Sequence, residues 1–210
     1  MKSYVKRESE MILKRLLEVY PEVPSFLNYA NPFQLLVAVI LSAQCTDAMV
    51  NRVTPALFDA FPDPQALSQA PLETLEPLIF KTGFYKTKAA HIKDTARILV
   101  ERHDSEVPGD FEQLIALPGV GRKTAHVICG TLFHQPALIV DTHFKRVVGR
   151  LGLTKETHPE GVEKDLGKWV AGKDQYKFSM AANLHGRLLC QARKPRCGEC
   201  FLADLCPSAL

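Results

Sequence analysis

The sequence has no apolar run long enough to cross a membrane. Its longest unbroken stretch, Leu35–Leu41, is far shorter than the roughly 20 residues of a spanning helix. The N-terminal stretch is rich in charge and lacks the apolar core of a signal peptide, so we expect a cytoplasmic protein with no membrane partner. Glycine and proline, 12 and 14 of 210 residues, are too few for a collagen-like or low-complexity chain. With 46% hydrophobic residues, the composition fits a folded protein of one or two domains.

Strand signals are also scarce, since the chain has no Asn-Gly or Asp-Gly turn and no long alternation of apolar and polar residues. Only residues 137–140 could be a strand, and they are too short to make a sheet. N-cap residues followed by proline, or by Glu or Gln at the capping-box spacing, predict helix starts at Asn31-Pro32, Asp63-Pro64, 110–113 and 157–160. Glycines that would end helices are Gly83, Gly152 and Gly172. We therefore predict an all-α protein with about ten helices.

The net charge of +3 is small, but it is unevenly distributed. Residues 53–80 contain four acids and no Lys or Arg, whereas residues 113–150 contain five basic residues and one acid. A molecule with one basic face fits a polyanion such as nucleic acid. A chance fluctuation of surface charge would give the same pattern, so charge alone leaves both interpretations open.

Four of the six cysteines gather near the C-terminus with 6, 2 and 5 residues between them: Cys190, Cys197, Cys200 and Cys206. Disulfides are not expected in a cytosolic chain. Structural zinc sites also use C-x2-C pairs, but they usually place two such pairs well apart. One compact loop with four ligands favours a [4Fe-4S] cluster over zinc. The other two cysteines, Cys45 and Cys129, are expected to be buried thiols in helices.

The loop between the first two cluster cysteines carries three cations, Arg193, Lys194 and Arg196. A rigid loop with this charge could contact phosphates. Its alternative role is to offset the charge of a thiolate-ligated cluster.

Residues 111–132 predict two helices separated by a tight turn, Pro118-Gly119-Val120-Gly121. The turn lacks the Lys-Ser/Thr of a phosphate loop and the third glycine of a dinucleotide fingerprint. Two interpretations remain. The segment is either a helix-hairpin-helix that binds a DNA backbone phosphate without sequence specificity, or a plain connecting turn with no ligand.

Lys123 follows this turn at the start of the second helix, where the helix dipole disfavours a cation. A neutral lysine amine is a nucleophile for Schiff-base chemistry. The segment alone does not exclude a lysine that only binds phosphate.

Asp141 follows an apolar stretch and precedes a predicted helix beginning near His143. Its commonest role there is an N-cap, but a carboxylate in a basic segment could also stabilise an oxocarbenium ion or accept a proton. Capping would fix its position, so both roles are compatible. His143 is expected to be packed or to bind phosphate rather than to act as an acid or base.

These motifs together resemble the endonuclease III family of helix-hairpin-helix DNA glycosylases. The segments that carry the resemblance are LPGVGRKTA (117–125), VDTHFKRV (140–147), ILSAQCTD (40–47), KTGFYKTKA (81–89) and the cysteine cluster. The resemblance implies two helical lobes with a DNA-binding cleft between them. Residues 25–135 would form a six-helix barrel domain with the hairpin. Residues 1–24 and 136–210 would form the iron-sulfur cluster domain.

The resemblance also implies roles. Lys123 and Asp141 stand at the family's catalytic lysine and aspartate, and Gln44 and Phe84 stand where residues enter the duplex when the damaged nucleotide is flipped out. The alternative for Phe84 is a buried helix-cap contact after Gly83. The implied DNA contacts are Gln44, Phe84, Gly119, Gly121, Arg122, His143, Arg146, Arg193, Lys194 and Arg196.

The implied activity is a bifunctional glycosylase and AP lyase of base excision repair. It would remove oxidised pyrimidines such as thymine glycol from double-stranded DNA as a monomer, and would lie on the nucleoid while bound. Related monofunctional glycosylases specific for adenine or for thymine mismatches are expected to lack the lysine. A different class, a non-catalytic DNA-binding module with a zinc site, would be colourless, whereas an iron-sulfur protein is brown.

Overall fold

The structure, a computed structural model, describes residues 3–209, with side chains from Arg7 onward. Within these residues all regular secondary structure is helical, which confirms the all-α prediction. The α-helices are α1 (Ser3–Val19), α2 (Pro32–Leu41), α3 (Asp47–Ala60), α4 (Pro64–Ser68), α5 (Leu72–Ile79), α6 (Tyr85–Arg102), α7 (Phe111–Ile115), α8 (Arg122–Phe133), α9 (Thr142–Arg150), α10 (Pro159–Leu166) and α11 (Gly172–Leu188). The 3-10 helices are η1 (Phe80–Thr82), η2 (Cys197–Glu199) and η3 (Ala203–Leu205). No helix in this described part is long and apolar enough to span a bilayer.

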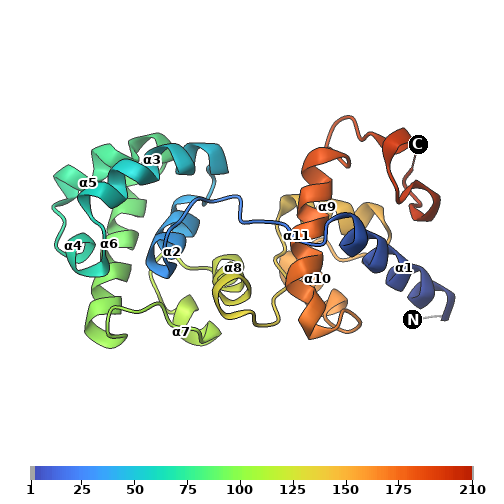
Figure 1. Ribbon diagram of the computed structural model, residues 1–210, viewed down its shortest axis with the longest axis horizontal. Coiled ribbons are helices and arrows are strands. Elements are labelled where there is room, and N and C mark those ends of the chain that lie inside the picture. The colour runs from blue at the N-terminus through green and yellow to red at the C-terminus, as the bar shows by residue number, and fades with distance from the viewer. Residues whose placement is uncertain (1–2, 210) are drawn as a thin grey trace. The chain divides into compact units, whose positions relative to one another are not determined.

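The chain divides into two compact units, Ser25–Phe133 and the combination of Met1–Pro24 with His134–Leu210. The core of the first unit is built on α2, whose residues from Leu35 to Leu41 are all buried. A helix that is apolar all round must be covered on every side, and α3, α6 and α8 contact it (Figure 1). The longest apolar run of the sequence is therefore the central helix of this unit.

The second unit is built on α11, which packs along α9 and also contacts α1 (Figure 1). Its core contains Ile12 from α1 and the edge-to-face pair Phe144 and Phe178, whose ring centroids lie 5.4 Å apart. Leu202, which lies between the last two cluster cysteines, is fully buried in the same core. The cysteine segment is thus anchored to the helices by apolar packing.

Local cap signals predicted several helix starts correctly. Asn31, Asp63 and Asp110 each accept a bond from the backbone amide three residues later, at 2.9, 2.8 and 2.9 Å. The predicted capping box at 157–160 is wrong. Because Pro159 takes the first position of α10, the N-cap is His158, which makes no side-chain cap bond.

Two of the three predicted helix-ending glycines are confirmed, since Gly83 and Gly152 follow helices with φ of +69°. Gly172 instead begins α11, and a Cβ there would lie 3.1 Å from Pro136. Residues 137–140 are buried but form no strand. The amide of Ile139 donates to the Ser179 hydroxyl at 2.9 Å, so a side chain of α11 takes the place of a strand partner.

Candidate functional site

The predicted turn between two helices is present, with α7 ending at Ile115 and α8 beginning at Arg122. The Thr95 hydroxyl of α6 donates to the Pro118 carbonyl at 2.9 Å and ties the turn to the helical core. Gly121 is exposed, and no atom lies within 4 Å of where its Cβ would stand. The turn therefore leaves room for another molecule's backbone at this point.

Gly119 is required by both conformation and packing. Its φ is +77°, and a Cβ there would lie 2.9 Å from His91 Nδ1 and 3.0 Å from Ile40 Cγ2. Only glycine meets both conditions without strain. Its predicted part in binding DNA therefore depends on turn shape rather than on a side chain.

Lys123 lies in the first turn of α8 and is exposed. Arg122 beside it is also exposed, and its guanidinium stands over the Phe111 ring at 5.1 Å from the centroid. This stacking holds the arginine against the start of α7. The arrangement presents a lysine amine and an arginine together at a helix N-terminus.

Asp141 is the N-cap of α9, as predicted, and its Oδ1 accepts from the Phe144 amide at 2.7 Å. Its other oxygen accepts a hydrogen bond from Asn183 Nδ2 of α11. Asn183 in turn accepts from Arg187 Nε at 2.7 Å. Sequence reasoning missed Asn183; the available signal was one amide inside the small and apolar run 179–184.

His143 and Arg146, two predicted DNA contacts on α9, are partly buried. Burial lowers the pKa of His143, and the Asp141 carboxylate partly opposes that effect. Arg146 donates to the Gly186 carbonyl at 2.8 Å and to the Cys190 carbonyl at 3.0 Å. Arg146 thus joins α9 to α11 and to the cysteine segment, and its contact with DNA stays a prediction.

Gln44 and Phe84, the residues expected to enter the duplex, are both exposed and both left-handed, with φ of +52° and +49°. Phe84 is 66% exposed, so the alternative of a buried helix-cap contact is wrong. Cys45 lies outside any helix, contrary to prediction, because α2 ends at Leu41 and the chain turns at Gln44. Cys129 lies in α8 and is buried as predicted, which raises the pKa of its thiol.

Lys88 of α6 connects the two segments that carry Gln44 and Phe84. It is only 5% exposed, and its Nζ donates to the Leu41 carbonyl at 2.9 Å and to the Thr82 carbonyl at 2.8 Å. Burial lowers its pKa. Sequence reasoning missed this residue, because its spacing does not show that the helix face around it is covered.

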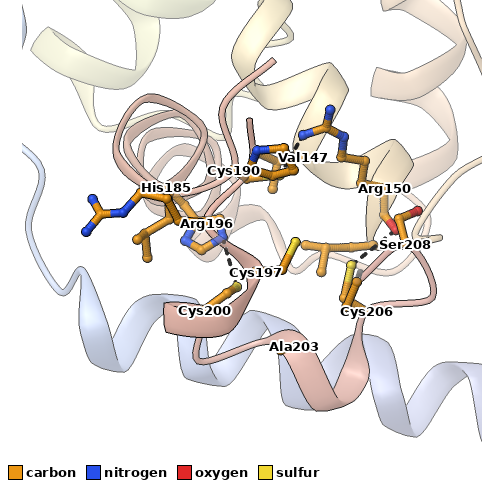
Figure 2. Close-up of a pocket in the computed structure, with 14 residues that line it drawn as sticks. Val147, Arg150, His185, Cys190, Arg196, Cys197, Cys200, Ala203, Cys206 and Ser208 are labelled. Carbon is orange, nitrogen blue, oxygen red and sulfur yellow. Dashed lines mark hydrogen bonds between the residues drawn. The ribbon is translucent and has the colours of Figure 1, made fainter. Parts of the chain in front are cut away.

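The four clustered cysteines line one pocket of the second unit, together with Val147, Arg150 and His185 (Figure 2). Arg150 Nη1 donates to the Cys190 sulfur at 3.4 Å, and His185 Nε2 lies 3.5 Å from the Cys200 sulfur. Four sulfurs around one space, with a guanidinium beside them, fit an anionic four-thiolate cluster. The donor set thus agrees with a [4Fe-4S] group.

The cationic loop after Cys190 is held by α9. Arg150 donates to the Gln191 and Ala192 carbonyls at 2.8 and 3.0 Å. Arg193 and Lys194 are exposed, whereas Arg196 forms an ion pair with Glu199. The loop therefore presents two cations that make no ion pair in the described part of the chain.

Two family models match the chain. Residues 37–171 match the HhH-GPD superfamily of base excision DNA repair proteins, and residues 190–206 match the iron-sulfur binding domain of endonuclease III. Endonuclease III of Synechocystis is 50% identical, over 97% of this chain and 94% of the relative. Endonuclease III of Escherichia coli K12 is 45% identical over 93% and 92%. The chain belongs to the endonuclease III family.

Solved structures agree with the family assignment. A non-covalent endonuclease III–DNA complex aligns with a TM-score of 0.92 at 40% identity, covering 97% of this chain and 96% of that one. A thermostable thymine-DNA glycosylase, at 20% identity and a TM-score of 0.85, shares the fold alone. This member of the endonuclease III family is therefore a DNA glycosylase and lyase of base excision repair, with a [4Fe-4S] cluster.

Proposed function

We propose that this enzyme removes oxidised pyrimidines, such as thymine glycol, from duplex DNA with Lys123 as its nucleophile. The observation that carries the proposal is the exposed Lys123 amine in the first turn of α8, directly after the Gly119 hairpin. A relative 39% identical over 97% of this chain has been solved as a trapped covalent endonuclease III–DNA intermediate, which supports a covalent route. Covalent catalysis divides one difficult displacement into two easier steps.

The first bond to form joins Lys123 Nζ to C1′ of the damaged nucleotide, as the C1′–base bond breaks and the base leaves with the bonding electrons. Loss of a proton from nitrogen and opening of the sugar ring give a Schiff base. The imine makes the C2′ proton acidic. When that proton is removed, its bonding electrons form a C2′–C3′ double bond, and the 3′ phosphate leaves with the electrons of the C3′–O bond. The strand is nicked 3′ to the lesion.

Asp141 would stabilise positive charge at the sugar and help deprotonate the Lys123 amine. Its cap bond to the Phe144 amide supports this role, because a carboxylate fixed at a helix N-terminus does not have to be oriented during the reaction.

Gln44 and Phe84 would fill the space left by the flipped nucleotide. A flat ring and an amide suit stacking and contact with the orphan base, and flipping is easier for a damaged base than for a paired one. The exposure of both side chains supports this role. Further contacts with the duplex would come from Gly119, Gly121, Arg122, His143, Arg146, Arg193, Lys194 and Arg196.

Cys190, Cys197, Cys200 and Cys206 would hold the cluster, which supplies a rigid centre for the cationic loop rather than redox chemistry in these steps. The enzyme would act as a monomer in the cytoplasm, on the nucleoid while bound to DNA. One binding face for one lesion requires no second copy.

Borohydride trapping on a duplex with one abasic site tests the nucleophile. Wild type should give a covalent band on a denaturing gel, because borohydride reduces the imine. Both Lys123→Ala and Lys123→Arg should give none. The arginine variant keeps the charge, so it separates a nucleophile from a lysine that only binds phosphate. An adduct with Lys123→Arg would overturn the proposal.

A further inference from the structure

The Asp141 carboxylate is held from two sides by elements that are distant in the sequence. Oδ1 accepts from the Phe144 amide of its own helix, and Oδ2 accepts from the Asn183 side chain of α11. Asn183 is only 6% exposed, so it is an amide buried against a carboxylate. Hydrogen bonds to ionised acceptors are about twice as strong as neutral ones, and this bond restricts the rotation of the carboxylate plane.

Arg187, one turn further along α11, determines which way the Asn183 amide faces. Arg187 Nε donates to Asn183 Oδ1 at 2.7 Å, which leaves Nδ2 to donate to Asp141. The flipped amide would place Nδ2 against the guanidinium N–H and Oδ1 against the carboxylate oxygen. Both contacts would be repulsive, because donor would meet donor and acceptor would meet acceptor.

We propose that Asn183, oriented by Arg187, is a positioning residue for the excision step: it fixes the Asp141 carboxylate in the orientation from which it acts on the sugar and on the nucleophile. The inference rests on the proposed role of Asp141. Asn183 is buried, with Asp141 and Arg187 as its partners, so its removal should slow the reaction without weakening the binding of DNA. An interaction that helps only the transition state alters the rate constant and leaves the ground state unchanged.

The experiment measures two quantities for wild type, Asn183→Leu, Asp141→Asn and the double variant. The first is the single-turnover rate of base release from a thymine glycol duplex. The second is the Kd for a duplex with a tetrahydrofuran abasic analogue, which the lyase cannot cleave. We expect Asn183→Leu to lower the rate about tenfold or more, the order set by one hydrogen bond to a charged group, while Kd changes less than about threefold.

The double variant tests whether Asn183 affects the rate through Asp141. If Asn183 acts through Asp141, then Asn183→Leu should lower the rate less than about twofold when Asp141 is already Asn, because coupled residues are not additive. Equal losses in both backgrounds would overturn the inference. A rate of Asn183→Leu within about twofold of wild type would also overturn it. In both cases Asp141→Asn would still be slow, so the proposed function would stand. If Asp141→Asn is as fast as wild type, the proposed role of Asp141 is wrong, and so is the inference about Asn183.

Two further variants separate positioning from folding. Asn183→Asp keeps the volume and the acceptor for Arg187 but places a second carboxylate against Asp141, and we expect a loss of rate at least as large. This variant decides the question if Asn183→Leu does not fold, and a rate near that of wild type would overturn the inference. Gln175→Met, on the same helix, removes a side-chain amide that donates to the Val170 carbonyl at 3.2 Å and does not bond to the segment that carries Asp141. It should leave the rate within about twofold.

Discussion

The buried Lys88 leads to a prediction about both stability and the loops that carry Gln44 and Phe84. Its amine connects the C-terminal end of α2 to the Thr82 carbonyl just before Gly83. Gln44 lies three residues beyond the first contact, and Phe84 two residues beyond the second. Replacing Lys88 with Met keeps most of the apolar stem but removes the amine, so the Leu41 and Thr82 carbonyls both lose their partner.

The size of the effect follows from these contacts. Leaving one buried acceptor unsatisfied typically destabilises a protein by about 1–3 kcal/mol. Two such carbonyls, less the gain from no longer burying a charged amine, give a loss of about 2–4 kcal/mol in the free energy of unfolding. Lys86 is exposed on the same helix, so Lys86→Met is a matched control with an expected change below about 0.5 kcal/mol.

Urea unfolding followed by circular dichroism, with the cluster in place, measures the change in the free energy of unfolding of the whole protein. Hydrogen–deuterium exchange of peptides that cover residues 41–46 and 82–85 measures the loss of protection in the two loops. Both segments should exchange faster in Lys88→Met and not in Lys86→Met. If the two variants unfold at the same urea concentration and exchange alike, Lys88 does not join these loops.

The pH dependence has a defined sign. Burial lowers the folded-state pKa of Lys88 below its ordinary 10.5, so the unfolded chain binds the proton more tightly. Wild type should therefore gain stability relative to Lys88→Met as the pH rises through the folded pKa toward 10.5, and should lose that gain as the pH falls again. Urea unfolding of both proteins at several pH values between 7 and 10.5 measures the difference between their free energies of unfolding. If this difference becomes smaller as the pH rises, the account is wrong.

Three other substitutions have defined outcomes. Gly119→Ala should weaken duplex binding and lower the free energy of unfolding, measured in urea, by about 1–3 kcal/mol, because φ is +77° and the added methyl meets two side chains. The control Gly121→Ala places its methyl in open space and should unfold at the same urea concentration as wild type. Arg150→Met removes the guanidinium that holds the cationic loop, so a ferrous chelator should bleach the visible absorbance of the cluster several-fold faster than in wild type; an unchanged rate would show that the loop is held by other contacts. Phe84→Gly relieves a left-handed backbone and should stabilise the fold by up to about 1 kcal/mol while slowing excision. The control is Phe80→Ala: Phe80 is also exposed, at 59%, and its replacement should not raise the free energy of unfolding.

Features set by neighbouring residues could be predicted from the sequence. The caps at Asn31, Asp63, Asp110 and Asp141 each need only an oxygen and an amide three residues later. The hairpin needs a proline and two glycines, and the cysteine spacing fits one compact centre. Where two local rules competed, as at 157–160, the proline rule decided the helix start.

Contacts between distant segments could not be predicted in this way. Asn183 is 42 residues from Asp141, and Lys88 is 47 residues from Leu41, so no local spacing brings either pair together. Each is a single polar residue inside a helix, and the sequence does not show which distant group it contacts. Its burial depends on how the helices pack, and only tertiary structure shows that.

The backbone conformation at Gln44 and Phe84 supports the roles proposed for them. Within residues 3–209, the non-glycine residues with positive φ are Gln44, Phe84, Asp104, Ser105 and His134. Aspartate and histidine adopt this region several times more often than other residues, so Asp104 and His134 need little explanation. Ser105 belongs to the turn that ends α6, where its amide donates to the Leu99 carbonyl at 2.9 Å. Glutamine and phenylalanine have no such preference for the left-handed region, and glycine would be less strained at both positions. Both side chains are exposed, so packing does not require them. Strain that neither local preference nor burial explains is typical of residues retained for what they contact outside the fold.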